Sequence, residues 1–242
     1  MKHAEWMHLA AVEYTRILSL LRDLNESDWS ALTDCDPWTV RDMVSHLIGA
    51  AEATASIREQ IRQQRAGKAR QGNAELMATV NALQISERAN LSPTELVDLL
   101  TDAAARGVHA RSALPAVVRM FKLRLPAPWH WTSLGYLYGP IYTRDAWVHR
   151  IDICRATGRE LVLTPEHDGV IVADLVTDLG RGSGPRSGAR SGEGAAPNID
   201  LTGPAGGHFG TGSALAYDAI EFSRALAGRG TIAGIEPAMA LF

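Results

Sequence analysis

A helical period in the apolar residues runs through most of the first 160 residues of this chain. In four segments, apolar side chains recur at intervals of three and four residues, which is the spacing of one face of an α-helix. The segments are 4–24, a stretch starting after Thr39, another starting after Ser92, and 134–157. Four amphipathic helices with connections of mixed length predict an antiparallel four-helix bundle.

Local start signals support two of these helices. Thr39 can cap a helix with Asp42 at the third position of a capping box, and we expect that helix to continue to near Gly67. Ser92 is a stronger signal of the same type, because a proline follows at the first helical position and Glu95 lies three residues after Ser92. Both signals place a helix start within a residue or two.

The composition changes after Gly158, a residue typical of a helix end. Residues 199–202 have the pattern of a strand, and the glycine-rich stretch 203–212 follows as a hairpin region. Asp218 can cap a final helix with Glu221 at its third position. This part of the chain therefore mixes short strands and helices.

The predicted fold class is α+β. An N-terminal antiparallel four-helix bundle over 1–160 is followed by a small C-terminal α/β domain over 161–242. Within the second domain, 181–197 consists almost entirely of Gly, Ser, Arg, Ala and Pro, so we expect a mobile loop there.

Composition excludes several classes of protein. The 24 Lys and Arg residues against 27 Asp and Glu residues give a net charge of -3, without the excess of positive charge that nucleic acid or an anionic membrane attracts. No apolar run reaches the roughly 18 residues of a membrane span, and the two cysteines are too few for a disulfide scaffold. No P-loop, dinucleotide-binding or nucleophile-elbow motif occurs. We expect a protein of the reducing cytoplasm, without nucleic-acid or membrane partners.

Polar residues on the predicted helix 134–157 are surrounded by apolar ones. Asp145 and His149 are four residues apart and project from one face, and Asp152 lies about one turn further on. The flanking positions on the helical wheel are apolar on one side (Leu137, Ile141, Val148) and on the other (Tyr142, Ala146, Ile153). A solvent-facing stripe would have Lys, Glu or Gln as neighbours, so these polar side chains are predicted to point into the bundle.

Two interpretations explain such a buried polar group. His46 lies at the edge of the apolar face of the second predicted helix, and with Asp145 and His149 it would form a three-ligand site for a divalent metal with a position left open. Alternatively, Asp145 hydrogen-bonds to His149 in a polar core network and His46 is a core histidine with its own partners. Spacing alone leaves both interpretations open.

Four segments of the sequence resemble the DinB-like, mycothiol-dependent maleylpyruvate isomerase family. They are 35–42 (CDPWTVRD) with the following His46 and Leu47, 144–152 (RDAWVHRID), 200–207 (DLTGPAGG) and 225–229 (ALAGR). The resemblance touches both predicted domains. It implies a metal-binding four-helix bundle followed by a small domain that resembles a sterol-carrier module.

The resemblance also implies a ligand set. In the family the metal, expected to be zinc, is held by two histidines that match His46 and His149 and by an acid that matches Asp145. The isomerase has a glutamate at that third position, so this chain offers an acid one methylene shorter. Arg229 matches an arginine that would bind an acidic group of the substrate, although a helix C-terminal cation explains it equally well.

The implied activity is a thiol-dependent one. Mycothiol or a similar small thiol would attack a small electrophilic, possibly acidic substrate, and the outcome would be isomerisation or S-transfer. Asp152 and Asp42 are candidates to accept hydrogen bonds from the metal-binding histidines and orient them; an ion pair with Arg150 or Arg155 is the other role for Asp152. The alternative function is a non-catalytic protein that binds a small molecule or metal on the same scaffold. A monomer or homodimer is expected.

Overall fold

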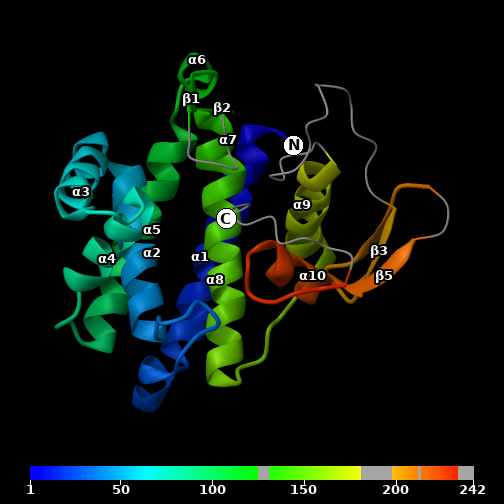
Figure 1. The fold of residues 1–242 in the computed structure, drawn as a ribbon, viewed down its shortest axis with the longest axis horizontal. Coiled ribbons are helices and arrows are strands. Elements are labelled where there is room, and N and C mark those ends of the chain that lie inside the picture. The colour runs from blue at the N-terminus through cyan, green and yellow to red at the C-terminus, as the bar shows by residue number, and fades with distance from the viewer. Residues whose placement is uncertain (125–130, 181–197, 212–213, 234–242) are drawn as a thin grey trace. The chain divides into compact units, whose positions relative to one another are not determined.

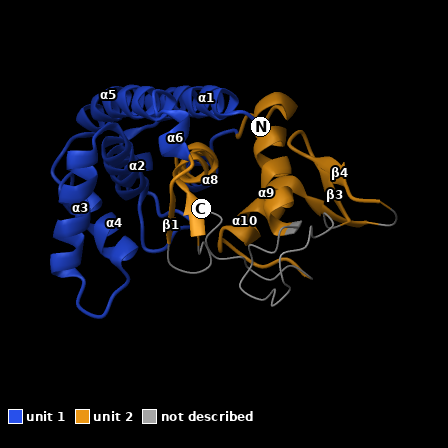
Figure 2. Ribbon diagram, turned by 90° about the horizontal axis from the view of Figure 1, so that it is seen from above, with its two compact units in different colours: residues 1–119, 149–160 blue, residues 120–148, 161–242 orange. Residues whose placement is uncertain are grey.

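The computed structural model describes residues 1–124, 131–180, 198–211 and 214–233 (Figure 1). Contacts divide the chain into two compact units, with 1–119 and 149–160 in unit 1 and 120–148 and 161–242 in unit 2 (Figure 2). The sequence-based division at residue 160 assigns 120–148 to the bundle, whereas the contacts group this segment with the C-terminal part of the chain.

Unit 1 is built from helices. They are α1 (His3–Arg22), η1 (Glu26–Ser30), α2 (Val40–Ala55), α3 (Ile57–Arg70), α4 (Leu76–Ser86), α5 (Pro93–Ser112), α6 (Ala116–Arg119) and the C-terminal half of α8 (Tyr142–Thr157). The α5 helix packs against α1 and α2, and the α3–α4 pair packs on α2. Fully buried leucines such as Leu47, Leu96 and Leu100 form the core. Burial of these amphipathic faces is the main stabilising contribution.

The predicted helix starts at Thr39 and Ser92 are confirmed. The Thr39 hydroxyl accepts a hydrogen bond from the backbone N–H of Asp42, and Ser92 does the same for Glu95, so both capping boxes form. The expected continuation of the second helix to Gly67 is wrong. Ser56 has an extended backbone and caps a separate helix, α3, because its hydroxyl accepts from the N–H of Glu59.

Unit 2 combines short strands and helices. They are β1 (Lys122–Arg124), β2 (Trp131–Ser133), α7 (Leu134–Tyr136), η2 (Leu137–Ile141), the N-terminal half of α8, η3 (Pro165–Gly169), α9 (Val170–Gly180), β3 (Ile199–Thr202), β4 (Gly207–Phe209), β5 (Leu215–Asp218) and α10 (Ala219–Leu226). The larger sheet has the order β4-β3-β5, with β4 antiparallel and β5 parallel to β3. The predicted α+β class is therefore confirmed.

The predicted strand 199–202 and the hairpin after it are also confirmed. Gly203 has φ of +90° and the N–H of Gly206 bonds to its carbonyl, so the turn between β3 and β4 uses a conformation that favours glycine. The predicted mobile loop 181–197 lies outside the described residues.

The predicted helix 134–157 forms with one irregularity. Residues Leu137–Ile141 make a π-helical turn that contains Pro140, which has no N–H to donate. Regular α-helix resumes in α8 and ends at Gly158, whose φ is +65°. One continuous helical segment thus carries Asp145 and His149 on successive turns.

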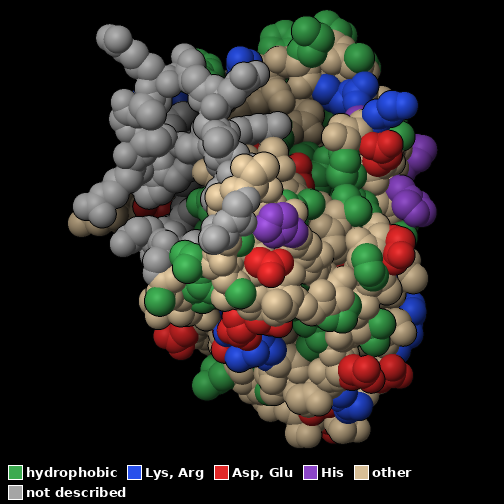
Figure 3. Space-filling view, turned by 90° about the vertical axis from the view of Figure 1, so that its right-hand side faces the viewer, with side chains coloured by type: hydrophobic (Ala, Val, Ile, Leu, Met, Phe, Trp, Pro, Cys, Tyr) green, Lys and Arg blue, Asp and Glu red, His purple; other side chains and the backbone are tan. Residues whose placement is uncertain are grey.

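Charged side chains of both signs are mixed on one face of the molecule. On the face drawn in Figure 3, acidic and basic side chains are interspersed among polar and apolar ones rather than gathered in a patch of one sign. Among the described residues, no helix is both long enough and apolar enough to cross a membrane.

Candidate metal centre

Three potential metal ligands lie close together at the α2–α8 contact. His46 is on α2, and Asp145 and His149 are one turn apart on α8. One ligand atom from each of the three side chains lies within 4.8 Å of the other two. Both histidines are buried and Asp145 is half-buried, so the cluster is shielded on the histidine side and less so at the carboxylate.

The His149 ring is oriented by a carboxylate on its own helix. Asp152, fully buried, accepts a hydrogen bond from Nδ1 of His149 at 3.3 Å. This bond leaves Nε2 as the nitrogen that can face a metal ion. Asp152 therefore lies where the sequence analysis placed an acceptor for an imidazole.

The His46 ring is oriented by an amide. Nδ1 of His46 lies 2.8 Å from Oε1 of Gln84, a buried residue of α4. Gln84 in turn donates to Gln63 of α3 at 2.8 Å. Each histidine thus has its Nδ1 engaged by the protein, which is the usual arrangement behind a metal-binding imidazole.

Trp38 packs beside both imidazoles. Its ring centroid is 5.2 Å from that of His46 and 6.2 Å from that of His149, and the two imidazoles are themselves 5.2 Å apart at 84°. The preceding loop is held by hydrogen bonds from the N–H and hydroxyl of Thr33 to the Trp38 carbonyl, at 2.9 and 2.8 Å. The indole therefore forms a wall next to the candidate ligands.

The other candidate acid near this site, Asp42, has a structural partner. Its carboxylate accepts hydrogen bonds from the N–H and hydroxyl of Thr39, at 2.9 and 2.7 Å, and so completes the N-terminal cap of α2. These bonds explain the acid at this position through helix capping. A role toward His46 stays a prediction.

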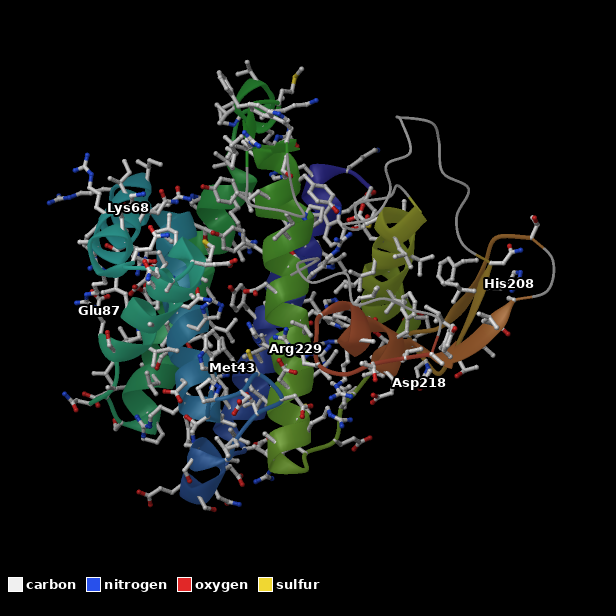
Figure 4. All side chains as sticks on the ribbon, viewed as in Figure 1. Met43, Lys68, Glu87, His208, Asp218 and Arg229 are labelled. Carbon is white, nitrogen blue, oxygen red and sulfur yellow. The ribbon has the colours of Figure 1, made fainter. Side chains whose placement is uncertain are left out.

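Arg229 follows α10 in unit 2, at the opposite end of that helix from its N-cap Asp218 (Figure 4). Its guanidinium donates to the carbonyl of Ala227 at 2.6 Å. A cation at this place satisfies carbonyls at the helix C-terminus. A role for Arg229 in substrate binding stays a prediction.

The donor set fits a divalent metal. Two neutral imidazoles and one carboxylate are the ligands of many catalytic zinc sites, and three protein ligands leave a coordination position for a further group. The burial of both histidines with their Nδ1 atoms already engaged matches this use.

Several residues around the cluster escaped the sequence analysis. Gln84 lies on α4, a helix that was not predicted because its N-cap residue, Glu75, makes no capping hydrogen bond with its side chain. Gln63 belongs to the stretch that was predicted as the continuation of the second helix. Trp38 lies within the segment 35–42 on which the resemblance is based, but no spacing rule indicates that its ring lies beside both histidines.

Comparison with known proteins gives the family. A family model described as the mycothiol maleylpyruvate isomerase N-terminal domain matches residues 10–154, which is more than half of the 242 residues. Two solved structures have a similar fold: the mycothiol-dependent maleylpyruvate isomerase and a mutant of it with one histidine replaced by alanine. Each is 15% identical, with a TM-score of 0.62, and the match covers 95% of this chain and 90% of that chain.

No curated protein sequence matches this chain significantly. At 15% identity the two structural matches show the fold alone. The family model covers the segments 35–47 and 144–152, on which the resemblance is based. That resemblance is confirmed: the chain belongs to the mycothiol maleylpyruvate isomerase family.

Proposed function

We propose that this chain is a divalent-metal-dependent enzyme that uses mycothiol or a similar small thiol to isomerise, or to transfer the thiol to, a small electrophilic substrate. The observation that carries the proposal is the cluster of His46, Asp145 and His149, whose ligand atoms lie within 4.8 Å of one another. Membership of the family supports the thiol, because the family is named for its dependence on mycothiol.

In this proposal the three clustered side chains hold the metal, with zinc as the expected ion. A bound divalent ion supplies a Lewis acid that lowers the pKa of a thiol, so that a thiolate is available at neutral pH. His46 and His149 would bind through Nε2, since Nδ1 of each is engaged by Gln84 and Asp152 respectively. The Trp38 ring would limit the access of water to the two imidazoles.

The substrate chemistry follows from a reactive thiol. Addition of the thiol to a conjugated double bond leaves a single bond about which the substrate can rotate, and loss of the same thiol then completes an isomerisation. Displacement of a leaving group by the thiol is S-transfer instead. Arg229 is proposed to bind an acidic group of the substrate.

The first test is the metal content of protein purified without a histidine tag and without chelators. About one divalent ion per chain in the wild type, and its loss in His46→Ala, would support the site. A wild-type protein that contains no metal and takes up no added Zn²⁺ would contradict it. Circular dichroism on both proteins controls for folding.

The second test separates catalysis from binding. Turnover of small electrophiles, maleylpyruvate among them, should require both the thiol and His149. Loss of turnover in His149→Ala with a folded protein supports an enzyme. A wild type that binds the thiol or the electrophile without turning it over would favour the non-catalytic binding protein instead.

A further inference from the structure

A line of two buried amide side chains runs behind His46. Gln84 of α4 and Gln63 of α3 are 3% and 1% exposed, and both side chains have hydrogen-bond partners at each end. Starting from the histidine, the contacts are His46 Nδ1 to Gln84 Oε1 at 2.8 Å and Gln84 Nε2 to Gln63 Oε1 at 2.8 Å. The line ends at Gly49 and Glu59, which both contact Nε2 of Gln63.

The far end of this line sets its direction. Nε2 of Gln63 lies 3.0 Å from the carbonyl oxygen of Gly49 and 3.0 Å from Oε1 of Glu59. A backbone carbonyl can only accept a hydrogen bond. The same holds for an ionised carboxylate, and Glu59 forms an ion pair with Arg62 at 2.6 Å. The NH₂ group of Gln63 must therefore face these two acceptors, and its oxygen must face Gln84.

Each amide then fixes the next group. Because the oxygen of Gln63 accepts, the end of Gln84 that faces it is the NH₂ group, and the oxygen of Gln84 faces His46. An amide oxygen only accepts, so Nδ1 of His46 must carry the proton. In the neutral ring, the lone pair is then on Nε2.

We propose that Gln63 and Gln84 are positioning residues that hold His46 in its Nδ1–H tautomer and so direct Nε2 toward the metal. The tautomer part of this inference depends only on the hydrogen bonds described above. The part that concerns the metal rests on the proposed function.

The backbone of α2 makes room for this line of amides. A Cβ atom at Gly49, three residues after His46, would lie 2.4 Å from Cγ of Gln84, which is closer than real Cβ contacts. A glycine at this position therefore lets Gln84 reach the ring. Buried amides are costly unless each polar group is paired, and a pair of leucines would fill the same space without that requirement. The presence of two buried amides in place of leucines is explained if they orient His46.

The two histidines also differ in their support. His149 faces a carboxylate, Asp152, which raises the basicity of an imidazole more than a neutral amide does. His46 faces a neutral amide on α4, whose direction is set by Gln63 and, through it, by Gly49 and Glu59. Removal of Gln84 should thus affect mainly the tautomer and orientation of His46.

The first measurement is the tautomer of His46 in metal-free protein, from the ¹⁵N chemical shifts of its ring at about pH 8, where an ordinary imidazole is neutral. We expect Nδ1 to be protonated in the wild type. A wild-type ring protonated at Nε2 would overturn the inference whether or not the protein binds metal. Gln84→Leu removes the acceptor, and we expect this ring to show a mixture of tautomers or the Nε2–H form.

The second measurement is the affinity for Zn²⁺ alone, by competition with a chromogenic chelator. Gln84→Leu should bind Zn²⁺ about 10–100-fold more weakly. Gln63 contacts none of the three candidate ligands, but Gln63→Leu should also weaken Zn²⁺ binding. Without the hydrogen bond from Gln84 to Gln63, the side-chain amide of Gln84 can flip and present its NH₂ group to His46. Gln84→Glu keeps an acceptor for Nδ1 and should retain the wild-type tautomer.

The matched control is Asn81→Leu. Asn81 is also an amide on α4, and among the described residues its buried Oδ1 has no hydrogen-bond partner. This variant should leave both the tautomer and the Zn²⁺ affinity unchanged. Wild-type affinity in folded Gln84→Leu, with its tautomer also unchanged, would refute the positioning role. Failure of the wild type to bind Zn²⁺ would instead refute the proposed function, and the tautomer measurement would still test the amides.

Discussion

Glu13 and Arg150 are 137 residues apart in the sequence and form a buried ion pair between α1 and α8. Nε and Nη2 of Arg150 lie 2.6 and 3.3 Å from the two carboxylate oxygens of Glu13, and the side chains are 3% and 0% exposed. Arg150 directly follows His149, so the pair fixes α8 against α1 beside a candidate metal ligand. A paired guanidinium and carboxylate at this depth restrict both the rotation and the sliding of the helix.

Loss of one partner should be strongly destabilising. Glu13→Gln removes the negative charge of the buried pair while the Arg150 guanidinium stays buried, and the expected decrease in the free energy of unfolding is about 3–5 kcal/mol. Urea denaturation measures it. Replacement of both residues by leucine should recover most of the loss, because both charges of the pair are then removed together.

An exposed pair serves as the control. Asp102 and Arg106 lie four residues apart on α5, with side chains 64% and 53% exposed. Asp102→Asn should change the free energy of unfolding by no more than about 0.5 kcal/mol. If Glu13→Gln has an equally small effect, water reaches the Glu13–Arg150 pair and it does not fix the helix.

Substitution of Asp152 and of Asp42 should have different effects, one on the affinity for Zn²⁺ and the other on the stability of the fold. Asp152→Asn keeps the shape of the side chain but weakens the acceptor for His149, so Zn²⁺ affinity should fall about 10–100-fold with little change in folding. Chelator competition measures the affinity. Asp42→Ala removes the hydrogen bonds to Thr39 and should lower the free energy of unfolding by about 1 kcal/mol while the Zn²⁺ affinity stays the same.

Each of the opposite results is informative. Unchanged affinity in Asp152→Asn would mean that the 3.3 Å bond to His149 does not tune that ligand. A loss of affinity in Asp42→Ala larger than its loss of stability would assign Asp42 a role toward His46 beyond the helix cap.

Local signals in the sequence were enough to predict the long helices. Thr39 and Ser92 begin helices because their hydroxyls satisfy backbone N–H groups that no helical carbonyl can reach, and this requires only residues three positions apart. Ser56 with Glu59 gives the same kind of signal and was overlooked, so α2 and α3 were merged. The start of α4 at Glu75 has no such signal and depends on packing against α2 and α3.

The candidate ligands could be predicted, but not their supports. Asp145 and His149 stand out because they are four residues apart among apolar neighbours, and helix geometry alone places them on one face. Gln84 supports His46 across 38 residues, and the direction of its amide depends, through Gln63, on Gly49 of α2 and Glu59 of α3. No spacing rule in one sequence records such a contact, because it exists only after three helices have packed.

A buried arginine in unit 2 offers a separate test of folding. Arg144 is fully buried, contacts Asp174, donates to Asp178 at 2.7 Å and to the hydroxyl of Tyr136 at 3.1 Å. Arg144→Met would remove the positive charge from this buried group, and we expect a loss of about 3–5 kcal/mol in the free energy of unfolding, measured by urea denaturation.

The comparison variant is Arg155→Met. Arg155 pairs with Asp34 at 2.8 Å, but both side chains are more than a third exposed. The decrease in the free energy of unfolding should be below about 1 kcal/mol. An equally small decrease in Arg144→Met would argue that water reaches the Arg144 group and that the ion pairs there do not stabilise unit 2.

Cys154 should be a poor nucleophile in a protein whose proposed chemistry uses an external thiol. Burial raises the pKa of its thiol from 9.0 to about 11, and the residue is 4% exposed. At pH 8 it should carry about a hundredfold less thiolate than an ordinary cysteine, and access is restricted as well. Cys35→Ser leaves Cys154 as the sole thiol, and its alkylation by iodoacetamide can be followed by mass spectrometry.

We expect this alkylation to be slow at pH 8, to accelerate up to about pH 11, and to be fast at pH 8 in urea. The raised pKa also has a consequence for stability. Between pH 9 and 11 the folded state keeps the proton that the unfolded chain loses, so the free energy of unfolding should fall as the pH rises through this range. The fall should be absent from Cys154→Ser. Alkylation at pH 8 as fast in the folded protein as in urea would show a reactive thiol at Cys154, and an internal nucleophile would then compete with the external thiol in the proposed reaction.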